Sequence, residues 1–163
     1  MLIELLTAGG LVKLLFALGL VLVTVVIHVV GFSALLRAIM WSRALDKSGF
    51  GPATRLVIAL TCWLLLIHLL EISVWGLFYF WQGCLPDAES ALYFSGVTYT
   101  TVGYGDLVLP KPWRLLAPLE AMTGILMGGL STGLFFAVVS RWISNFVKRR
   151  TALDPRSAAP KNK

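Results

Sequence analysis

Three long apolar segments, residues 11–36, 56–81 and 113–146, constrain the fold of this chain more than any other feature. The first is 26 residues long and would extend about 39 Å as an α-helix, whereas a hydrocarbon core is about 30 Å thick. Hydrophobic residues make up 58% of the 163 residues and charged residues only 13%, which is more apolar surface than so small a soluble domain buries. The sequence therefore predicts an all-α membrane protein with three transmembrane helices.

The cysteines and histidines are few and far apart. Cys62 and Cys84 have no short metal-ligand spacing, and His28 and His68 stand forty residues apart in apolar segments. We therefore expect no zinc site, no cofactor and no dense disulfide framework. Cys84 is expected to be either a free thiol or, in an oxidising compartment, half of an intersubunit disulfide.

A shorter apolar segment, residues 88–99 with the sequence AESALYFSGVTY, lies between the second and third long segments. As a helix it would be only about 18 Å long, which is too short to cross the hydrocarbon core. Asp87 is a candidate N-cap, and Glu89 is well placed in the first turn. The sequence therefore predicts a re-entrant helix, which membranes tolerate where protein buries it or where it lines water.

Basic residues are concentrated in two segments. Residues 37–55 hold four and the tail from residue 141 holds seven of the fourteen, together with only two of the eight acids. By the positive-inside rule both segments are cytoplasmic, so the N-terminus and the re-entrant helix lie on the outer side of a cell (inner) membrane. This distribution accounts for the formal net charge of +6 without a nucleic-acid partner.

Local patterns flank the second long segment. Gly49, Gly51 and Pro52 predict that residues 37–55 form a polar loop. Five aromatic residues close the segment at its other end and predict an interfacial belt: Trp75, Phe78, Tyr79, Phe80 and Trp81.

The motif TTVGYGD, residues 100–106, directly follows the predicted re-entrant helix. Glycines that alternate with bulky residues permit unusual φ values, so that successive carbonyls turn to the same side. Replacing the hydration shell of an alkali cation needs several oxygens at each level, which one chain alone does not supply. The ladder therefore requires identical chains around an axis. The expected ion ligands are the carbonyls of Thr101, Val102, Gly103 and Tyr104, with the Thr101 hydroxyl at the inner end.

This motif resembles the signature of the potassium channel family, and AESALYFSGVTYTTVGYGDLVLP resembles that family's pore helix, filter and outer mouth. The resemblance covers residues 56–146 and implies a homotetramer that conducts K⁺ through a central pore and performs no enzymatic chemistry. Residues 120–142 look most like the inner helix of prokaryotic inward-rectifier-type channels. We accordingly divide the chain into an additional first helix and cytoplasmic loop (1–55), a pore domain (56–147) and a short basic cytoplasmic tail (148–163) that is expected to be disordered.

The resemblance assigns a filter of Thr101, Val102, Gly103, Tyr104 and Gly105, supported by Thr100, Asp106, Val97 and Glu120. Val97 replaces a glutamate that in some relatives bonds to the aspartate after the filter, so Asp106 needs another partner or stays solvated. Tyr93 and Phe94 replace two tryptophans of some relatives, which alters the aromatic surroundings of Tyr104. Glu120 is expected level with the filter, where it braces the re-entrant helix or makes an ordinary structural contact.

Several inner-helix residues have two interpretations each. Gly124, Gly128 and Gly129 predict either a gating hinge or close helix packing. Phe136, next to Phe135, resembles a hydrophobic gate but is equally compatible with packing against lipid. Lys148, Arg149 and Arg150 either bind anionic lipid or simply anchor the topology.

His68 and Glu71 stand three residues apart and share one helical face near mid-membrane, where ionisable groups face protein or water. They form either a pH-sensing pair or a structural contact. His28 is expected to be a satisfied core histidine.

No long segment carries Arg or Lys at every third position, so we expect no voltage sensor. Two alternatives to a potassium channel stay open: a non-selective cation channel, and a non-conducting membrane adaptor whose additional first helix is a docking surface.

Overall fold

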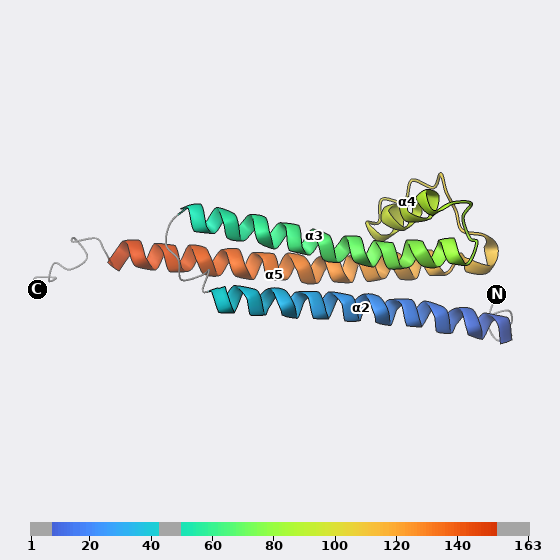
Figure 1. Cartoon of the computed structure of the whole chain (residues 1–163), viewed down its shortest axis with the longest axis horizontal. Coiled ribbons are helices and arrows are strands. Elements are labelled where there is room, and N and C mark those ends of the chain that lie inside the picture. The colour runs from blue at the N-terminus through green and yellow to red at the C-terminus, as the bar shows by residue number, and fades with distance from the viewer. Residues whose placement is uncertain (1–7, 43–49, 153–163) are drawn as a thin grey trace, which may run out of the picture.

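The computed structural model describes residues 8–42 and 50–152, and within these residues it is helical with no strand. Its elements, in chain order, are the helices α2 (Ala8–Ser42), α3 (Phe50–Trp81), α4 (Ala88–Tyr99), the 3₁₀ turn η2 (Lys111–Trp113) and α5 (Leu116–Ala152). Helices α2, α3 and α5 run along one another, and α4 lies at the end where α2 begins and α3 ends (Figure 1). The predicted all-α fold is confirmed.

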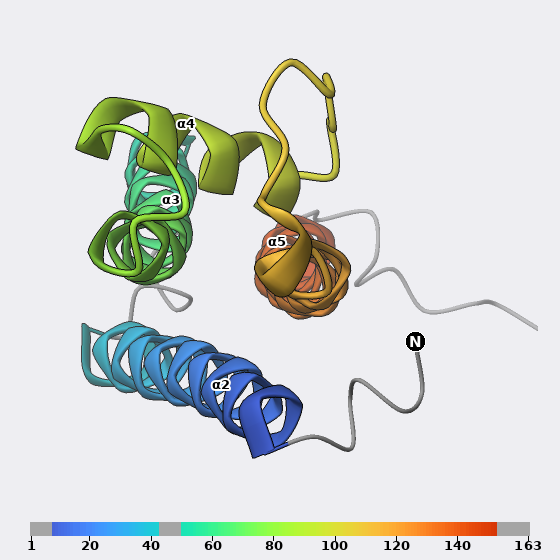
Figure 2. The same ribbon diagram turned by 90° about the vertical axis from the view of Figure 1, so that its right-hand side faces the viewer.

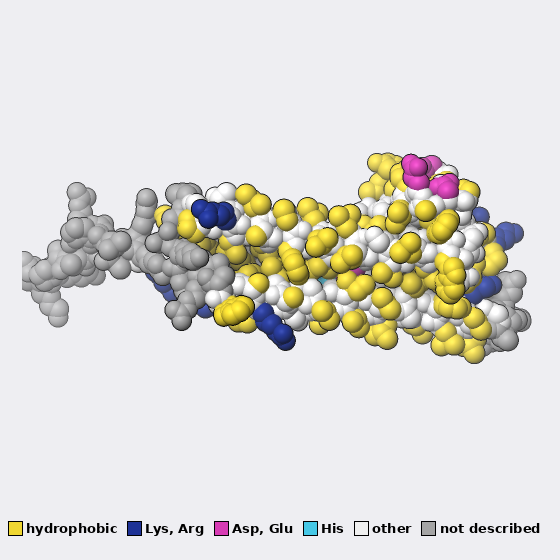
Figure 3. Space-filling model, viewed as in Figure 1, with side chains coloured by type: hydrophobic (Ala, Val, Ile, Leu, Met, Phe, Trp, Pro, Cys, Tyr) yellow, Lys and Arg dark blue, Asp and Glu magenta, His cyan; other side chains and the backbone are white. Residues whose placement is uncertain are grey.

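Three segments are long and apolar enough to cross a membrane: Gly9–Trp41, Gly51–Trp81 and Lys111–Lys148. Most of their apolar side chains face outward in the single chain, and the surface of the bundle is correspondingly hydrophobic (Figure 3). Such a surface is stable in lipid and not in water. The protein is therefore a membrane protein, as the sequence predicts.

The α4 helix has the predicted bounds because local chemistry sets its start. Asp87 is the N-cap in extended conformation, and its carboxylate accepts hydrogen bonds from the Ser90 backbone N–H at 2.7 Å and the Ser90 hydroxyl at 3.0 Å. These hydrogen bonds, the backbone one above all, hold the pKa of Asp87 below its ordinary value. Glu89 lies in the first turn, where a negative charge favours the helix.

The long helices extend further than their apolar segments. The predicted loop over residues 37–55 is wrong at both ends, because α2 continues to Ser42 and α3 already begins at Phe50. Residues 43–49, with Gly49, lie outside the described part of the chain. Pro52 is accommodated in the first turn of α3, where its missing N–H costs no helical hydrogen bond. Likewise α5 continues to Ala152, so the described part of the predicted tail is helical.

Helices α3 and α5 lie side by side, with α4 on one side of them and α2 on the other (Figure 2). One buried cluster lies at the α4 end and includes Ala17, Trp75, Phe94 and Leu116. A second cluster lies toward the opposite end, where Leu35 of α2 meets side chains of α3 and α5. The helix α2 is thus packed along the bundle and is not a detached anchor.

The predicted aromatic belt is wrong for three of its five members. Trp75 and Tyr79 are fully buried and Phe78 is buried, because they face the neighbouring helices and not lipid. The Trp75 ring donates Nε1–H to Thr24 Oγ1 of α2 at 3.0 Å. Only Phe80 and Trp81 remain exposed, as an interfacial position requires.

Candidate functional site

The backbone of the loop that follows α4, residues 100–106, alternates in handedness. Thr101, Gly103 and Gly105 have φ values of +62°, +56° and +78°. Glycine adopts such values freely, whereas a β-branched threonine there costs about 1–3 kcal/mol. A left-handed residue at every second position lets successive carbonyls face the same way. The φ values of the loop therefore agree with the backbone expected of an oxygen ladder.

Hydrogen bonds from the end of α4 hold the start of this loop. The carbonyl of Val97 accepts the N–H groups of Val102 at 3.0 Å and Gly103 at 3.2 Å. The Thr100 hydroxyl donates to the Gly96 carbonyl at 2.6 Å, and Thr101 N–H donates to the Thr98 carbonyl at 2.9 Å. Position 97 thus supports the loop through its carbonyl rather than through a side chain, which is why valine suffices there.

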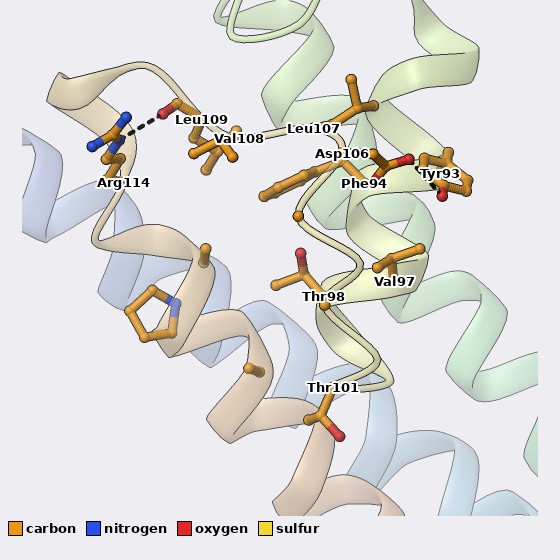
Figure 4. A pocket seen from close by; sticks show the side chains of 15 residues that line it. Tyr93, Phe94, Val97, Thr98, Thr101, Asp106, Leu107, Val108, Leu109 and Arg114 are labelled. Carbon is orange, nitrogen blue, oxygen red and sulfur yellow. Dashed lines mark hydrogen bonds between the residues drawn. The ribbon is translucent and has the colours of Figure 1, made fainter.

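Every residue from 101 to 106 is exposed in the single chain; Val102 is 53% and Tyr104 is 72% exposed. Beside the loop lies a cleft of about 370 Å³, bounded by α4 on one side and the start of α5 on the other (Figure 4). Val97 and Thr98 line it from α4, and Arg114, which donates to the Leu109 carbonyl at 3.2 Å, lies across it. One chain therefore encloses neither face of the loop.

Asp106 has a partner that the motif does not reveal. The Tyr93 hydroxyl donates to Asp106 Oδ2 at 2.8 Å (Figure 4). This hydrogen bond raises the pKa of the Tyr93 hydroxyl above its ordinary value. The neighbouring Phe94 is buried instead, edge-on to Tyr79 with 5.4 Å between ring centroids. Tyr93 and Phe94 thus make different contacts, the first with Asp106 and the second with Tyr79.

Glu120 is fully buried where three helices meet. Its carboxylate accepts the Tyr79 hydroxyl of α3 at 2.7 Å and lies 2.5 Å from Ser95 Oγ of α4. Ser95 Oγ also lies 2.8 Å from the Ile72 carbonyl of α3. The Glu120 carboxylate therefore connects α5 to the re-entrant helix α4. The sequence positions of Tyr79 and Ser95 do not indicate that either residue contacts Glu120.

Glu71, also fully buried, is the centre of a second polar cluster. Its carboxylate lies 2.9 Å from His28 Nδ1 and 3.1 Å from His68 Nδ1, and it accepts a short hydrogen bond from the Tyr99 hydroxyl. His68 Nε2 lies 3.0 Å from Ser131 Oγ of α5. Helices α2, α3, α4 and α5 all contribute to this cluster.

The two histidines that are forty residues apart in the sequence lie close together in the structure. Potential ligand atoms of His28, His68 and Glu71 all lie within 4.8 Å of one another. Because α2 and α3 pack antiparallel, His28 of α2 and His68 of α3 lie next to each other on neighbouring helices. Two imidazoles and a carboxylate are a donor set that suits a divalent transition metal, but here the same atoms satisfy one another as hydrogen-bond partners.

The inner-helix glycines have different surroundings. A Cβ at Gly124 would lie 2.0 Å from the Tyr99 carbonyl oxygen, so close packing against the end of α4 requires glycine there. A Cβ at Gly128 or Gly129 would meet nothing within 4 Å in the single chain. Phe136 is 72% exposed, whereas Phe135 packs against the second buried cluster.

Two further predicted sites lie away from the loop. Cys84 is a buried free thiol whose pKa is raised by that burial, and this burial opposes a disulfide to another chain. Lys148 is exposed at the C-terminal end of α5. The side chains of Arg149 and Arg150 lie outside the described part of the structure.

Comparison with known proteins identifies the segment that holds the loop. Residues 67–144 match the family model described as an ion channel. This segment is similar to ion channel domains. It contains α4, the 100–106 loop, Glu71 and Glu120, whereas α2 lies entirely before it. No curated protein and no solved structure matches the chain. The match supports ion transport as the function of this segment.

Proposed function

We propose that the protein is a potassium-selective channel. The carbonyls of Thr101, Val102, Gly103 and Tyr104, with the Thr101 hydroxyl, replace the hydration shell of K⁺. The observation that carries this proposal is the alternating positive φ at residues 101, 103 and 105 in the loop of a segment similar to ion channel domains. Gly105 and Asp106 end the ladder at the outer mouth, and Thr100 and Val97 support its inner end.

The working unit of the proposed channel is a homotetramer. One chain offers one carbonyl at each level, and four chains around an axis offer a ring. The exposure of the whole 101–106 loop supports this assembly, as do the exposed apolar side chains on α5, such as Met122, Ile125 and Leu126. Glu120 keeps the re-entrant helix at a fixed distance from α5 in every subunit.

The electrostatics of the loop's surroundings favour a cation. The C-terminal end of α4, with its partial negative charge, directly precedes Thr100. Acidic side chains lie over the other end of α4 (Figure 3), where Asp87 and Glu89 are exposed. Together with Asp106 they raise the local cation concentration at the mouth.

The charges at the two ends of the bundle support a topology. Arg37, Arg55, Arg141 and Lys148 lie near the ends of helices remote from α4. The positive-inside rule places that end in the cytoplasm and α4 with the N-terminal end of α2 outside, in the inner membrane of the cell. Lys148, with Arg149 and Arg150, then faces the anionic headgroups of the cytoplasmic leaflet. The channel performs no covalent chemistry and needs no cofactor.

A flux assay on the purified chain in liposomes tests this function. We expect K⁺ efflux from wild-type protein and none above background from Gly103→Ala, with Na⁺ efflux near background in both. Equal K⁺ and Na⁺ efflux would point to a non-selective cation channel. Absent flux, or flux that Gly103→Ala leaves unchanged, would point to a non-conducting adaptor.

A further inference from the structure

A hydrogen-bond chain runs from α2, the helix outside the segment similar to ion channel domains, to the residue that ends the re-entrant helix. His28 of α2 is 1% exposed, and its Nδ1 lies 2.9 Å from Glu71 Oε1. The other carboxylate oxygen of Glu71 accepts the Tyr99 hydroxyl. One fully buried carboxylate thus connects the helix on the far side of the bundle to α4 (Figure 2).

Tyr99 is held from two directions, immediately before the ladder begins. Its hydroxyl is bonded to Glu71, and its carbonyl lies where a Cβ of residue 124 would be 2.0 Å away. Thr101, which adopts the strained φ of +62°, follows two residues later. The strained start of the ladder therefore depends on where Tyr99 is placed.

The proton count shows why His28 matters to this placement. An ionised carboxylate only accepts hydrogen bonds, and Glu71 has three potential donors: His28 Nδ1–H, His68 Nδ1–H and the Tyr99 hydroxyl. In that arrangement His28 Nε2 is a bare acceptor, which agrees with its having no hydrogen-bond partner among the described residues. Without the His28 N–H donor, one outcome is that the buried Glu71 carboxylate stays ionised with one hydrogen bond fewer. The other is that Glu71 becomes protonated and is then itself a hydrogen-bond donor, in competition with the Tyr99 hydroxyl.

We propose that His28 is a positioning residue for ion selection: it orients the Glu71 carboxylate, which in turn fixes Tyr99 and the inner end of the ladder. This inference rests on the proposed function, because it assigns to α2 control over the geometry of a selective filter. The helix α2 is then a built-in regulator of the pore and not only an anchor.

The structure offers a matched control on the same helix. Thr24, one turn before His28, accepts a hydrogen bond from Trp75 Nε1 at 3.0 Å, and both residues are fully buried. Trp63 Nε1 also donates to the Gly31 carbonyl of α2 at 2.9 Å. Neither bond involves a residue of α4. Because these bonds persist, loss of the His28 bond alone leaves α2 in place.

The test compares His28→Leu, which fills a similar volume without a donor, with Thr24→Val, in full-length protein reconstituted in planar bilayers. We expect His28→Leu to lower the K⁺/Na⁺ permeability ratio about threefold to tenfold, since one hydrogen bond to a charged group corresponds to about tenfold or more in an equilibrium constant. Thr24→Val is expected to lower the thermal stability of the protein and leave the ratio unchanged. His28→Asn, whose side-chain amide stands near the Nδ1 position, is expected to restore the ratio.

Tyr99→Phe probes the other end of the chain and should lower the ratio by itself. The double variant His28→Leu/Tyr99→Phe should be no worse than the more affected single variant, because both act through Glu71. A wild-type ratio in His28→Leu, or an equal loss in Thr24→Val, would overturn the proposal. If His28→Leu does not assemble, a wild-type ratio in Tyr99→Phe would overturn it instead, because the hydrogen bond between Tyr99 and Glu71 would then have no influence on ion selection. Wild-type protein that fails to prefer K⁺ would instead contradict the proposed function.

Discussion

At the scale of single residues, the positive φ values of Gly103 and Gly105 and the hydrogen bond between Tyr93 and Asp106 define the loop that follows α4. The glycines at positions 103 and 105 indicate a positive φ in the sequence itself, because only glycine adopts positive φ without cost. The partner of Asp106 is thirteen residues away on the re-entrant helix, and no spacing rule leads from it to Tyr93. The same holds for His28 and Glu71, which meet only because two long helices pack antiparallel.

Thr101 tests the contribution of a hydroxyl at the inner end of the ladder. Thr101→Ala removes the hydroxyl ligand, and we expect it to weaken K⁺ binding at the innermost site and lower K⁺ conductance several-fold. Thr101→Ser keeps the hydroxyl and should retain most of the conductance. Single-channel conductance in symmetric K⁺ measures both. Equal losses in the two variants would show that the side-chain oxygen is not a ligand.

Tyr93 tests the support of the outer mouth. Tyr93→Phe keeps the ring and removes the donor to Asp106. We expect sustained K⁺ current to decay a few-fold faster, because the loop after Gly105 loses its tether. Asp106→Asn is a weaker acceptor at the other end of the bond and should have a smaller effect in the same direction. Unchanged decay in Tyr93→Phe would contradict a tethering role.

At the scale of helices, apolar length predicted which segments are helical but not where each helix stops. The bounds of α4 followed from its N-cap and its short apolar run. Both ends of α2, the start of α3 and the C-terminal end of α5 lie beyond the apolar segments, because backbone hydrogen bonding continues into polar sequence once a helix has formed. The aromatic residues at the end of α3 were misplaced for a related reason. Composition indicates membrane depth but not which face of a helix meets a neighbour.

Substitutions at Gly124 and Gly128 distinguish a packing role from a hinge role for the glycines of α5. Gly124→Ala places a methyl group against the Tyr99 carbonyl, so α5 and α4 must move apart. We expect a loss of stability of about 1–3 kcal/mol per chain and a reduced fraction of correctly assembled protein. Gly128→Ala meets no atom within 4 Å in the chain and should leave stability near wild type or slightly raised. Thermal unfolding in detergent measures both, and equal stability of the two variants would contradict the close contact at Gly124.

At the scale of the whole molecule, the proposed channel is an assembly of identical chains. The 101–106 loop is exposed on its own, and α2 lies on the side of α3 and α5 away from α4 (Figure 2). Four chains with their loops around an axis would bury the loops centrally and leave α2 at the periphery. The sequence pointed to this assembly through the one-carbonyl-per-level argument. It did not indicate that His28 of α2 is hydrogen-bonded to Glu71, which in turn accepts the Tyr99 hydroxyl.

Native mass measurement in detergent tests the stoichiometry. We expect a species of four chains, each of 17.9 kDa, that persists at low protein concentration. Wild-type protein and the Cys84→Ser variant should give the same mass under oxidising and reducing conditions, because the burial of Cys84 opposes a disulfide between subunits. A monomer or dimer that still conducts would contradict the ring of carbonyls.

The reversal potential with K⁺ on one side of a bilayer and Na⁺ on the other measures whether the channel selects K⁺ over Na⁺. If the carbonyls from Thr101 to Tyr104 form a selective ladder, wild-type current reverses far from zero, toward the K⁺ equilibrium potential, and Gly103→Ala abolishes the current or moves its reversal toward zero. A wild-type reversal potential at zero, with measurable current, would show that these carbonyls do not select K⁺.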